Sequence, residues 1–253
     1  IWGIKKMTPN VVPTGLARDL LERKQSGKPI RIGLVGSGEM GTDIVTRASM
    51  MEGVEVAAIA DVDHARAHQA VTIAHGAKGH SADASSSDDI NALIEGGRTA
   101  VTSSDMLVQS GLIDVVVDAT GVPAVGAEIG LSAMENGKHL IMMNVEADVT
   151  IGAYLRSEAD RLGVVYSLGA GDEPSSCMEI IEFVTAMGHN IVCAGKGKNN
   201  PLNFDAVPED YEDEAHARNM NPRMLVEFVD GSKTMVEMAA IANATGLVPD
   251  IDG

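Results

Sequence analysis

The stretch from Ile30 to Val45 reads IRIGLVGSGEMGTDIV and joins an apolar run to a helical pattern through a glycine-rich turn. Gly36, Gly38 and Gly41 have the GxGxxG spacing. In a dinucleotide-binding loop the first glycine permits a tight turn, the second lets the backbone approach a pyrophosphate, and the third lets the helix pack on the sheet. Because the motif lies between a strand-like run and a helix-like pattern, it predicts a dinucleotide site.

An acidic side chain, Glu39, lies inside this loop. It falls in the expected first helical turn, where a carboxylate is stabilised by about 0.3–1 kcal/mol, and its side chain can point outward while the backbone faces the phosphate. Asp61 follows the next apolar run, and an acid there binds ribose hydroxyls and favours NAD. Arg66 or His64, just beyond, can instead bind the 2′-phosphate of NADP. The residues alone leave both cofactors open and favour NAD slightly.

Further apolar, β-branched runs occupy 54–60, 113–117, 139–143 and 164–168, with helical patterns between them. Near-continuous apolar strands are typical of a parallel sheet covered on both faces. The sequence therefore predicts an α/β fold with a Rossmann-type doubly wound parallel sheet. The Ser/Asp-rich stretch 81–89 is expected to be a surface loop or insertion.

The character of the chain changes after about residue 171. A helix is expected from Pro174, then a strand over MLVEFVDG (224–231) and a helix over SKTMVEMAAIANATG (232–246). These elements predict the start of a smaller α+β catalytic domain. We expect three parts: an N-terminal arm and helix (1–27), a dinucleotide-binding Rossmann domain (28–171) and an incomplete catalytic or substrate domain (172–253).

Composition excludes some function classes. The chain has 253 residues, with 19 Lys and Arg against 36 Asp and Glu, a formal net charge of −17. This balance argues against nucleic acid or an anionic membrane as a partner. Two cysteines cannot form a disulfide framework and fit reduced thiols in a cytoplasm. We expect a cytoplasmic homodimer.

Polar or glycine-rich residues follow three later strands. These are the segment from Asp118 to Gly121, the pair Asn144 and Glu146, and the stretch from Gly169 to Glu173. Because the carboxyl ends of parallel strands meet at one edge of the sheet, these residues should line one crevice with the glycine loop. The cofactor-binding residues predicted at this edge are Gly36, Ser37, Gly38, Glu39, Met40, Gly41, Asp61, Arg66, Ala119, Thr120, Gly121 and Asn144.

The segment GKGKNNPLN (195–203) is a compact cationic loop after an apolar run. In so acidic a chain it predicts that Lys196, Lys198, Asn199 and Asn200 bind an anionic substrate group such as a phosphate, although a solvated turn is the alternative. Asp172 and Glu173 can act at the site or cap the helix at Pro174. Lys233 and Glu237, spaced by four, are expected to form a pair on a helix surface.

Several motifs together resemble a known family. IGLVGSGEMG, DVVVDATG, MMNVEAD, LGAGDEP and GKGKNNPLN resemble the nucleotide-binding and early catalytic parts of homoserine dehydrogenase. They are more similar still to homoserine dehydrogenase-like proteins with a carboxy-terminal SAF domain, which include 1-deoxy-D-xylulose 5-phosphate reductoisomerase-like enzymes of isoprenoid biosynthesis. The resemblance spans roughly Gly27 to Gly253. In this chain Val145 follows Asn144, where both enzyme groups have a lysine, and Asp172-Glu173 replaces the Asp-x-Glu metal motif of reductoisomerases.

The resemblance implies an NAD(P)H-dependent oxidoreductase, with NADP set above NAD, and a divalent cation, Mg or Mn. It implies conversion of 1-deoxy-D-xylulose 5-phosphate into 2-C-methyl-D-erythritol 4-phosphate. The residues assigned to catalysis are Glu173, Asp172, Lys198 and Glu146, and the metal ligands are Asp172 and Glu173. Two alternatives remain: a homoserine dehydrogenase-like alcohol or aldehyde dehydrogenase, and a regulatory protein that senses NAD(P) without turnover.

Overall fold

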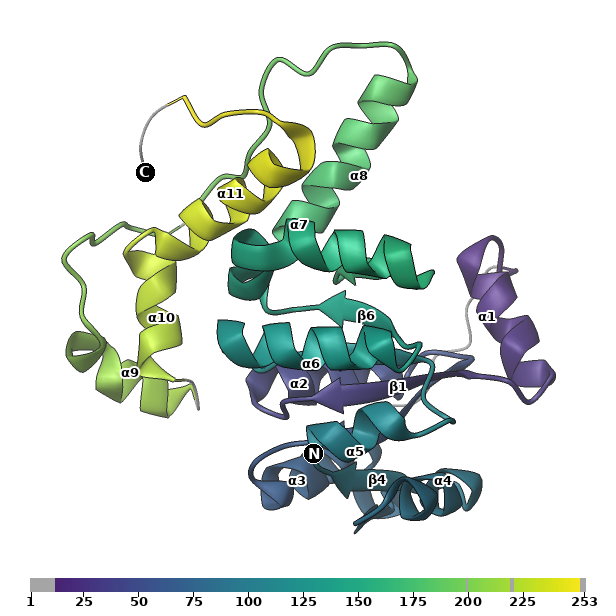
Figure 1. The fold of residues 1–253 in the computed structure, drawn as a ribbon. Helices are drawn as coiled ribbons and strands as arrows, with labels where there is room; N and C mark the ends of the chain where they lie inside the picture. Colours follow the sequence, from purple (N-terminus) through teal and green to yellow (C-terminus); the bar gives the residue numbers. More distant parts are fainter. Residues whose placement is uncertain (1–11, 199, 219–220, 251–253) are drawn as a thin grey trace.

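The computed structural model describes residues 12–198, 200–218 and 221–250. Its centre is a seven-stranded sheet in the order β3-β4-β2-β1-β5-β6-β7, with every neighbouring pair parallel (Figure 1). The strands are β1 (Ile30–Val35), β2 (Val54–Ala60), β3 (Ser81–Asp83), β4 (Thr99–Thr102), β5 (Val115–Asp118), β6 (His139–Met142) and β7 (Tyr166–Leu168). The chain winds outward from β1 in both directions, so the topological switch point lies between β1 and β5. The predicted doubly wound α/β fold is confirmed.

Helices cover both faces of this sheet. They are α2 (Glu39–Ala48), α3 (His64–His75), α4 (Ser87–Glu95), α5 (Ser104–Gln109), α6 (Pro123–Glu135) and α7 (Val145–Leu162), with a 3₁₀ turn η1 (Gly76–Lys78). Helix α1 (Leu16–Gln25) precedes β1 and buries none of its residues. One apolar cluster joins β1 and β2 to Val45 of α2 and Val71 of α3. The other joins the sheet to Leu107 of α5, Met134 of α6 and Leu155 of α7. The apolar strands are thus buried on both sides, as their composition requires.

After β7 the described residues form helices joined by loops, with no strand among them, so the α+β character expected of this region is not seen there. The region contains α8 (Glu173–Ala186), η2 (Pro208–Tyr211), α9 (Glu212–Ala217), α10 (Pro222–Val229) and α11 (Ser232–Thr245). Helix α11 packs on α7 and α8, and α8 extends beyond α7 at the top of Figure 1. Because α8 follows β7, this packing places α11 near the carboxyl end of that strand. No described helix has both the length and the apolar character needed to cross a membrane.

The prediction of a strand over MLVEFVDG is wrong, because most of these residues form α10. Asn221 caps this helix by accepting a hydrogen bond from the Arg223 N–H at 2.9 Å, and Pro222 occupies its first turn. A capping Asn followed by Pro is a helix-start signal. Leu225 and Val226 then face the interior. The short apolar run was therefore one side of a helix rather than a strand.

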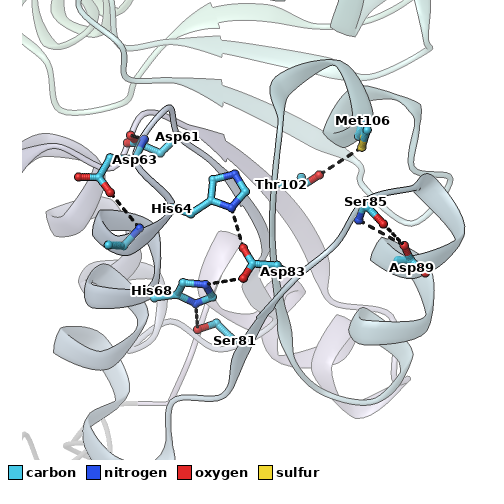
Figure 2. Close-up of polar contacts among 11 residues, drawn as sticks. Asp61, Asp63, His64, His68, Ser81, Asp83, Ser85, Asp89, Thr102 and Met106 are labelled. Atoms are coloured by element: carbon cyan, nitrogen blue, oxygen red, sulfur yellow. Dashed lines mark hydrogen bonds and ion pairs between the residues drawn. The ribbon is translucent and has the colours of Figure 1, made fainter.

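The loop expected over 81–89 is also wrong, since it contains β3 and the start of α4. Ser86 caps α4 by accepting from the Asp89 N–H at 3.1 Å, and Asp89 accepts hydrogen bonds from the backbone and hydroxyl of Ser85 (Figure 2). Ser and Asp are helix-capping residues as well as loop residues, which explains the error. The apolar run before the GKGKNN segment, expected to be a strand, is likewise not one among the described residues.

Candidate active site

The glycine loop has the geometry of a pyrophosphate cradle. Gly36 has φ +91°, and a Cβ there would lie 2.7 Å from the Ala119 carbonyl oxygen. At Gly41 a Cβ would overlap the Gly36 carbonyl. Gly38, the N-cap of α2, has no atom within 4 Å of a built Cβ, so open space lies at the helix start. These are the three roles expected of the motif, and the residues fit a nicotinamide dinucleotide.

Glu39 does not obstruct this cradle. It is the first residue of α2, and its side chain is exposed. Met40 beside it is 47% exposed. The prediction that Glu39 lies in the first turn, favourable to the helix dipole, is confirmed.

Asp61 braces the loop from the end of β2. One of its carboxylate oxygens accepts hydrogen bonds from the Ser37 N–H (2.7 Å) and hydroxyl (2.6 Å), and the other accepts from the Asp63 N–H (2.8 Å). Burial acts to raise the pKa of Asp61, but these hydrogen bonds outweigh it and hold the pKa below its usual value. Asp61 is therefore ionised. Arg66 is exposed, and its Nε lies 3.5 Å from Asp63.

Buried polar residues support the strand ends at the switch point. The carboxylate of Asp118 is fully buried and accepts from the Thr120 N–H (3.0 Å) and the Asn144 amide (3.2 Å). Burial raises the pKa of Asp118. The Asn144 oxygen caps α7 by accepting from the Ala147 N–H at 3.2 Å, so both ends of this amide are used. Gly126 of α6 was missed by the sequence reasoning, yet a Cβ there would collide with Asp118.

A second polar group lies where α8 meets α11. We call Asp172, Glu173, Lys196 and Glu237 the carboxylate–lysine cluster. The Lys196 ammonium lies 3.0 Å from Glu173 and also forms an ion pair with Glu237. Glu237 is only 1% exposed. The three carboxylates have oxygens within 4.8 Å of one another. Asp172 Oδ2 is buried and has no hydrogen-bond partner among the described residues.

The cluster shifts the proton affinities of its members. Burial, a hydrogen bond to Glu173 and the charge of Glu173 raise the pKa of Asp172 to about 6. Burial also acts to raise the pKa of Glu173, but hydrogen bonds, chiefly from Lys196, lower it below its usual value. When this pair takes up a proton, at about pH 6 and below, the proton therefore resides on Asp172 rather than on Glu173. Asp172 is the N-cap of α8 without making a side-chain capping hydrogen bond, so capping does not explain its position.

The lysines of the GKGKNN loop have different partners. Lys196 faces the carboxylates, whereas the Lys198 ammonium donates to the carbonyl of Phe228 in α10. The Asn200 amide donates to the same carbonyl at 3.0 Å. Asn199 lies outside the described residues. Lys198 and Asn200 thus tie the loop to α10, and Lys196 alone of these three belongs to the cluster.

Lys233 and Glu237 do not form the expected surface pair. Lys233 binds Glu146 at the start of α7 at 3.0 Å, while Glu237 is buried against Lys196. Glu237 falls on the face of α11 that also buries Ala240 and Ile241, three and four residues later. That spacing is the sequence signal that could have revealed an acid on the apolar side of the helix. The i,i+4 rule predicts proximity but not which partner lies across the interface.

The cluster fits a cation as well as a polar substrate group. Three carboxylates are offset by one ammonium, and carboxylate oxygens are the ligands that Mg²⁺ and Mn²⁺ prefer. Two members of the cluster, Asp172 and Glu173, follow the carboxyl end of β7 directly. It therefore lies at the edge of the sheet that carries the glycine loop.

Sequence comparison agrees with this geometry. Residues 33–168, more than half of the chain, match the family described as "Homoserine dehydrogenase, NAD binding domain". The chain belongs to this homoserine dehydrogenase-like family. Residues 171–253 of this family member match "Oxidoreductase DRL, catalytic domain". Both matched families are thus described as parts of oxidoreductases. No curated protein sequence matches the chain.

Solved structures are similar at low identity. An NAD-binding oxidoreductase from Klebsiella pneumoniae is 19% identical with a TM-score of 0.44, covering 63% of this chain and 39% of that one. Scyllo-inositol dehydrogenase from Lactobacillus casei, with bound NAD(H) and scyllo-inositol, is 18% identical with a TM-score of 0.43. Myo-inositol dehydrogenase from the same organism is 18% identical with a TM-score of 0.44. The last two comparisons each cover 62% of this chain and 42% of the other. The chain thus spans about two fifths of the length of these structures.

Proposed function

We propose that this chain binds a nicotinamide dinucleotide at the glycine loop and a small polar alcohol or carbonyl compound at the carboxylate–lysine cluster, as a homoserine dehydrogenase-like dehydrogenase. The observation that carries the proposal is the position of this cluster. It begins at the carboxyl end of β7, on the edge of the sheet where the open space at Gly38 receives the pyrophosphate. In doubly wound folds ligands bind at that edge.

The bound nicotinamide supplies or accepts the hydride. The residues of the chain handle the proton and the orientation of the substrate. Asp172, with a pKa raised to about 6, is poised to give a proton to an oxygen that becomes an alkoxide on reduction and to take it back on oxidation. Glu173, held ionised by Lys196, accepts hydrogen bonds from substrate hydroxyl or ammonium groups. Lys198 and Glu146, assigned to catalysis on sequence grounds, support the site by holding the loop and α11.

A second function has one observation in its favour. Asp172, Glu173 and Glu237 converge, and Asp172 Oδ2 is left without a hydrogen bond. A divalent cation bound there would hold a hydroxyketone, as reductoisomerisation of 1-deoxy-D-xylulose 5-phosphate requires. On this second proposal Lys196 and Lys198 would be free to bind the phosphate only after leaving their present partners.

The cofactor of either reaction also belongs to the proposal. Ionised Asp61 at the end of β2 supports NAD, since a carboxylate repels a 2′-phosphate. The NADP implied by the family resemblance needs a cation near that position. Arg66 is drawn toward Asp63 instead.

One experiment separates the candidates. Nicotinamide absorbance is followed with NAD(H) and NADP(H) across amino-acid aldehydes, other small alcohols and phosphorylated ketoses, with either a chelator or added Mg²⁺ or Mn²⁺. Turnover that persists with the chelator supports the dehydrogenase. Turnover of a phosphorylated ketose that needs the cation and gives a rearranged carbon skeleton supports the reductoisomerase. Tight dinucleotide binding without any turnover refutes both and leaves a sensing protein.

A further inference from the structure

A group of ionisable side chains lies beside the nucleotide loop and outside the site described above. We call His64, His68 and Asp83 the histidine–aspartate cluster (Figure 2). The His64 Nδ1 donates to one oxygen of Asp83 at 2.6 Å, and His68 Nε2 lies 3.5 Å from the other. The second ring nitrogen of His68, Nδ1, lies 2.8 Å from the Ser81 hydroxyl. The two histidines are one helical turn apart, so a single carboxylate on the edge strand β3 holds both.

The histidine–aspartate cluster lies next to the end of β2, where the fold places the adenosine ribose of a bound dinucleotide. His64 is the first residue of α3 and lies three residues beyond Asp61, at the end of β2. An acid at the end of the second strand of such a fold marks the 2′ position of the adenosine ribose. Figure 2 shows that only one nitrogen of the His64 ring is directed at Asp83, and the other points away from it. The His64 side chain is 46% exposed, so that second nitrogen can be reached from solvent.

We propose that protonated His64, oriented by Asp83, binds the 2′-phosphate of NADP(H), so that the preference of the protein for NADP over NAD rises as the pH falls. The proposal rests on the proposed function in requiring that a dinucleotide occupies the glycine loop. An imidazolium can donate from both ring nitrogens at once, to Asp83 and to a phosphate oxygen. A neutral ring that donates to Asp83 has no proton left for the phosphate.

The surrounding charges explain why protonation changes the outcome. The ionisable groups around His64 are Asp61 and Asp63 from the loop after β2, Asp83 from β3, and Arg66 and His68 from α3. With neutral histidines, three carboxylates face one guanidinium, and a 2′-phosphate is repelled. With both histidines protonated the charges balance, and the start of α3 adds its favourable dipole. The hydrogen bond from His64 is also the main cause that lowers the pKa of Asp83.

The test uses two fragments that differ only in the phosphate concerned. Binding of 2′,5′-ADP and of 5′-AMP is measured by calorimetry at about pH 6 and about pH 8, either side of the usual histidine range. In the parent, the preference for 2′,5′-ADP is expected to be about tenfold greater at the lower pH, the effect of one charge-assisted hydrogen bond. In His64→Gln that gain is lost. Asp83→Asn is expected to reduce it, because the ring loses its orientation.

His75→Gln is the matched control, because His75 is the exposed last residue of the same helix. It should keep the pH-dependent gain of the parent. The 2′-phosphate itself titrates near pH 6, but that contribution is the same in all variants and cancels in the comparison. Equal preferences in the parent and in His64→Gln at the lower pH would overturn the proposal.

The failure of the proposed function has a different signature. If the parent binds neither NAD(H) nor 5′-AMP, the dinucleotide site itself is wrong. If the parent and His64→Gln bind NAD(H) and 5′-AMP with equal affinity and also show the same preference for the 2′-phosphate, the dinucleotide site is right. Only the assignment of His64 is then wrong. Circular dichroism of each variant shows that the fold is retained.

Discussion

Asp118 in the nucleotide-binding half is fully buried and Asp172 in the helical region is partly buried; burial raises the pKa of both acids, but their surroundings differ. Asp118 accepts hydrogen bonds at both oxygens from Thr120 and Asn144. Asp172 has one oxygen without a partner and lies against Glu173 and Glu237. A buried polar group that is fully bonded supports the fold, whereas one left unpaired is costly unless a ligand completes it. The contrast distinguishes a satisfied network from the cluster at which we propose that the substrate binds.

Removing Lys196 is expected to have the largest effect, because it breaks the charge balance of the helical region. Lys196→Met leaves Glu237 buried beside two further acids, and loss of one partner of a buried pair costs about 3–5 kcal/mol. Urea unfolding measures the loss. Lys198→Met, which removes a hydrogen bond to a backbone carbonyl, is the matched control and should cost no more than about 1.5 kcal/mol. Equal losses in the two variants would show that the cluster is not a coupled ionic unit.

A bulky side chain in the glycine loop should weaken dinucleotide binding without disturbing the carboxylate–lysine cluster. Gly38→Val fills the open space at the start of α2 and should weaken dinucleotide binding about a hundredfold or more, with the fold intact. Gly111→Val is the control. A Cβ built at Gly111 also meets no atom within 4 Å, but this residue precedes β5 and so lies at the amino-terminal end of the strands, away from the glycine loop. Calorimetric titration of NAD(H) gives the affinities. An unchanged affinity in a folded Gly38→Val protein contradicts the assignment.

The unpaired acid should make stability depend on pH. Asp172 keeps its proton to about pH 6 when folded, against an ordinary value of 3.8, so the folded protein binds more protons between these values. Stability therefore falls as the pH rises through this window, by about 1–3 kcal/mol. Glu173 has the opposite sign, and its contribution is lost only as the pH falls below its usual 4.5.

Asp172→Asn is expected to flatten this decline between about pH 4.5 and pH 6.5, measured by thermal or urea unfolding at each pH. Asp118→Asn serves as the comparison from the other half. It should destabilise the protein because it disturbs a satisfied network. A parent whose stability is level across the window would mean that Asp172 ionises freely.

The smallest effect is expected at Arg66. Its exposed ion pair with Asp63 is worth about 0.2–1 kcal/mol, so Arg66→Ala should change stability little. Its effect on the affinity ratio of NADP to NAD should also be smaller than that of His64→Gln. A larger effect at Arg66 would return the 2′-phosphate to the arginine that the sequence first indicated.

The comparison of the two halves also explains how far the sequence could be read. The five apolar runs were found because a parallel strand buried on both faces is apolar along its whole length. Strands β3 and β4 were missed because they are short and polar at their ends, with Ser81 and Thr99 among their residues. The α10 helix was mistaken for a strand because a short apolar run does not reveal its period.

The glycine loop and Asp61 were predictable for a local reason. Their spacing, the strand before them and the helix after them are all written within 32 consecutive residues, from Ile30 to Asp61. Backbone sterics at Gly36 and Gly41 then permit little else. The histidine–aspartate cluster was not predictable in the same way, because Asp83 reaches His64 only through the pairing of β3 with β4.

The sequence by itself determined the doubly wound sheet, the nucleotide loop and the presence of acids and lysines after β7, because these depend on periodicity and short spacing. Only the tertiary structure decided which of those charges meet. Lys233 binds Glu146, 87 residues away, and the partly buried Lys196 lies between Glu173 and Glu237 of two different helices. Such pairs form because α11 packs across α7 and α8, and that long-range packing is set by the shape and apolar area of whole elements rather than by any local motif.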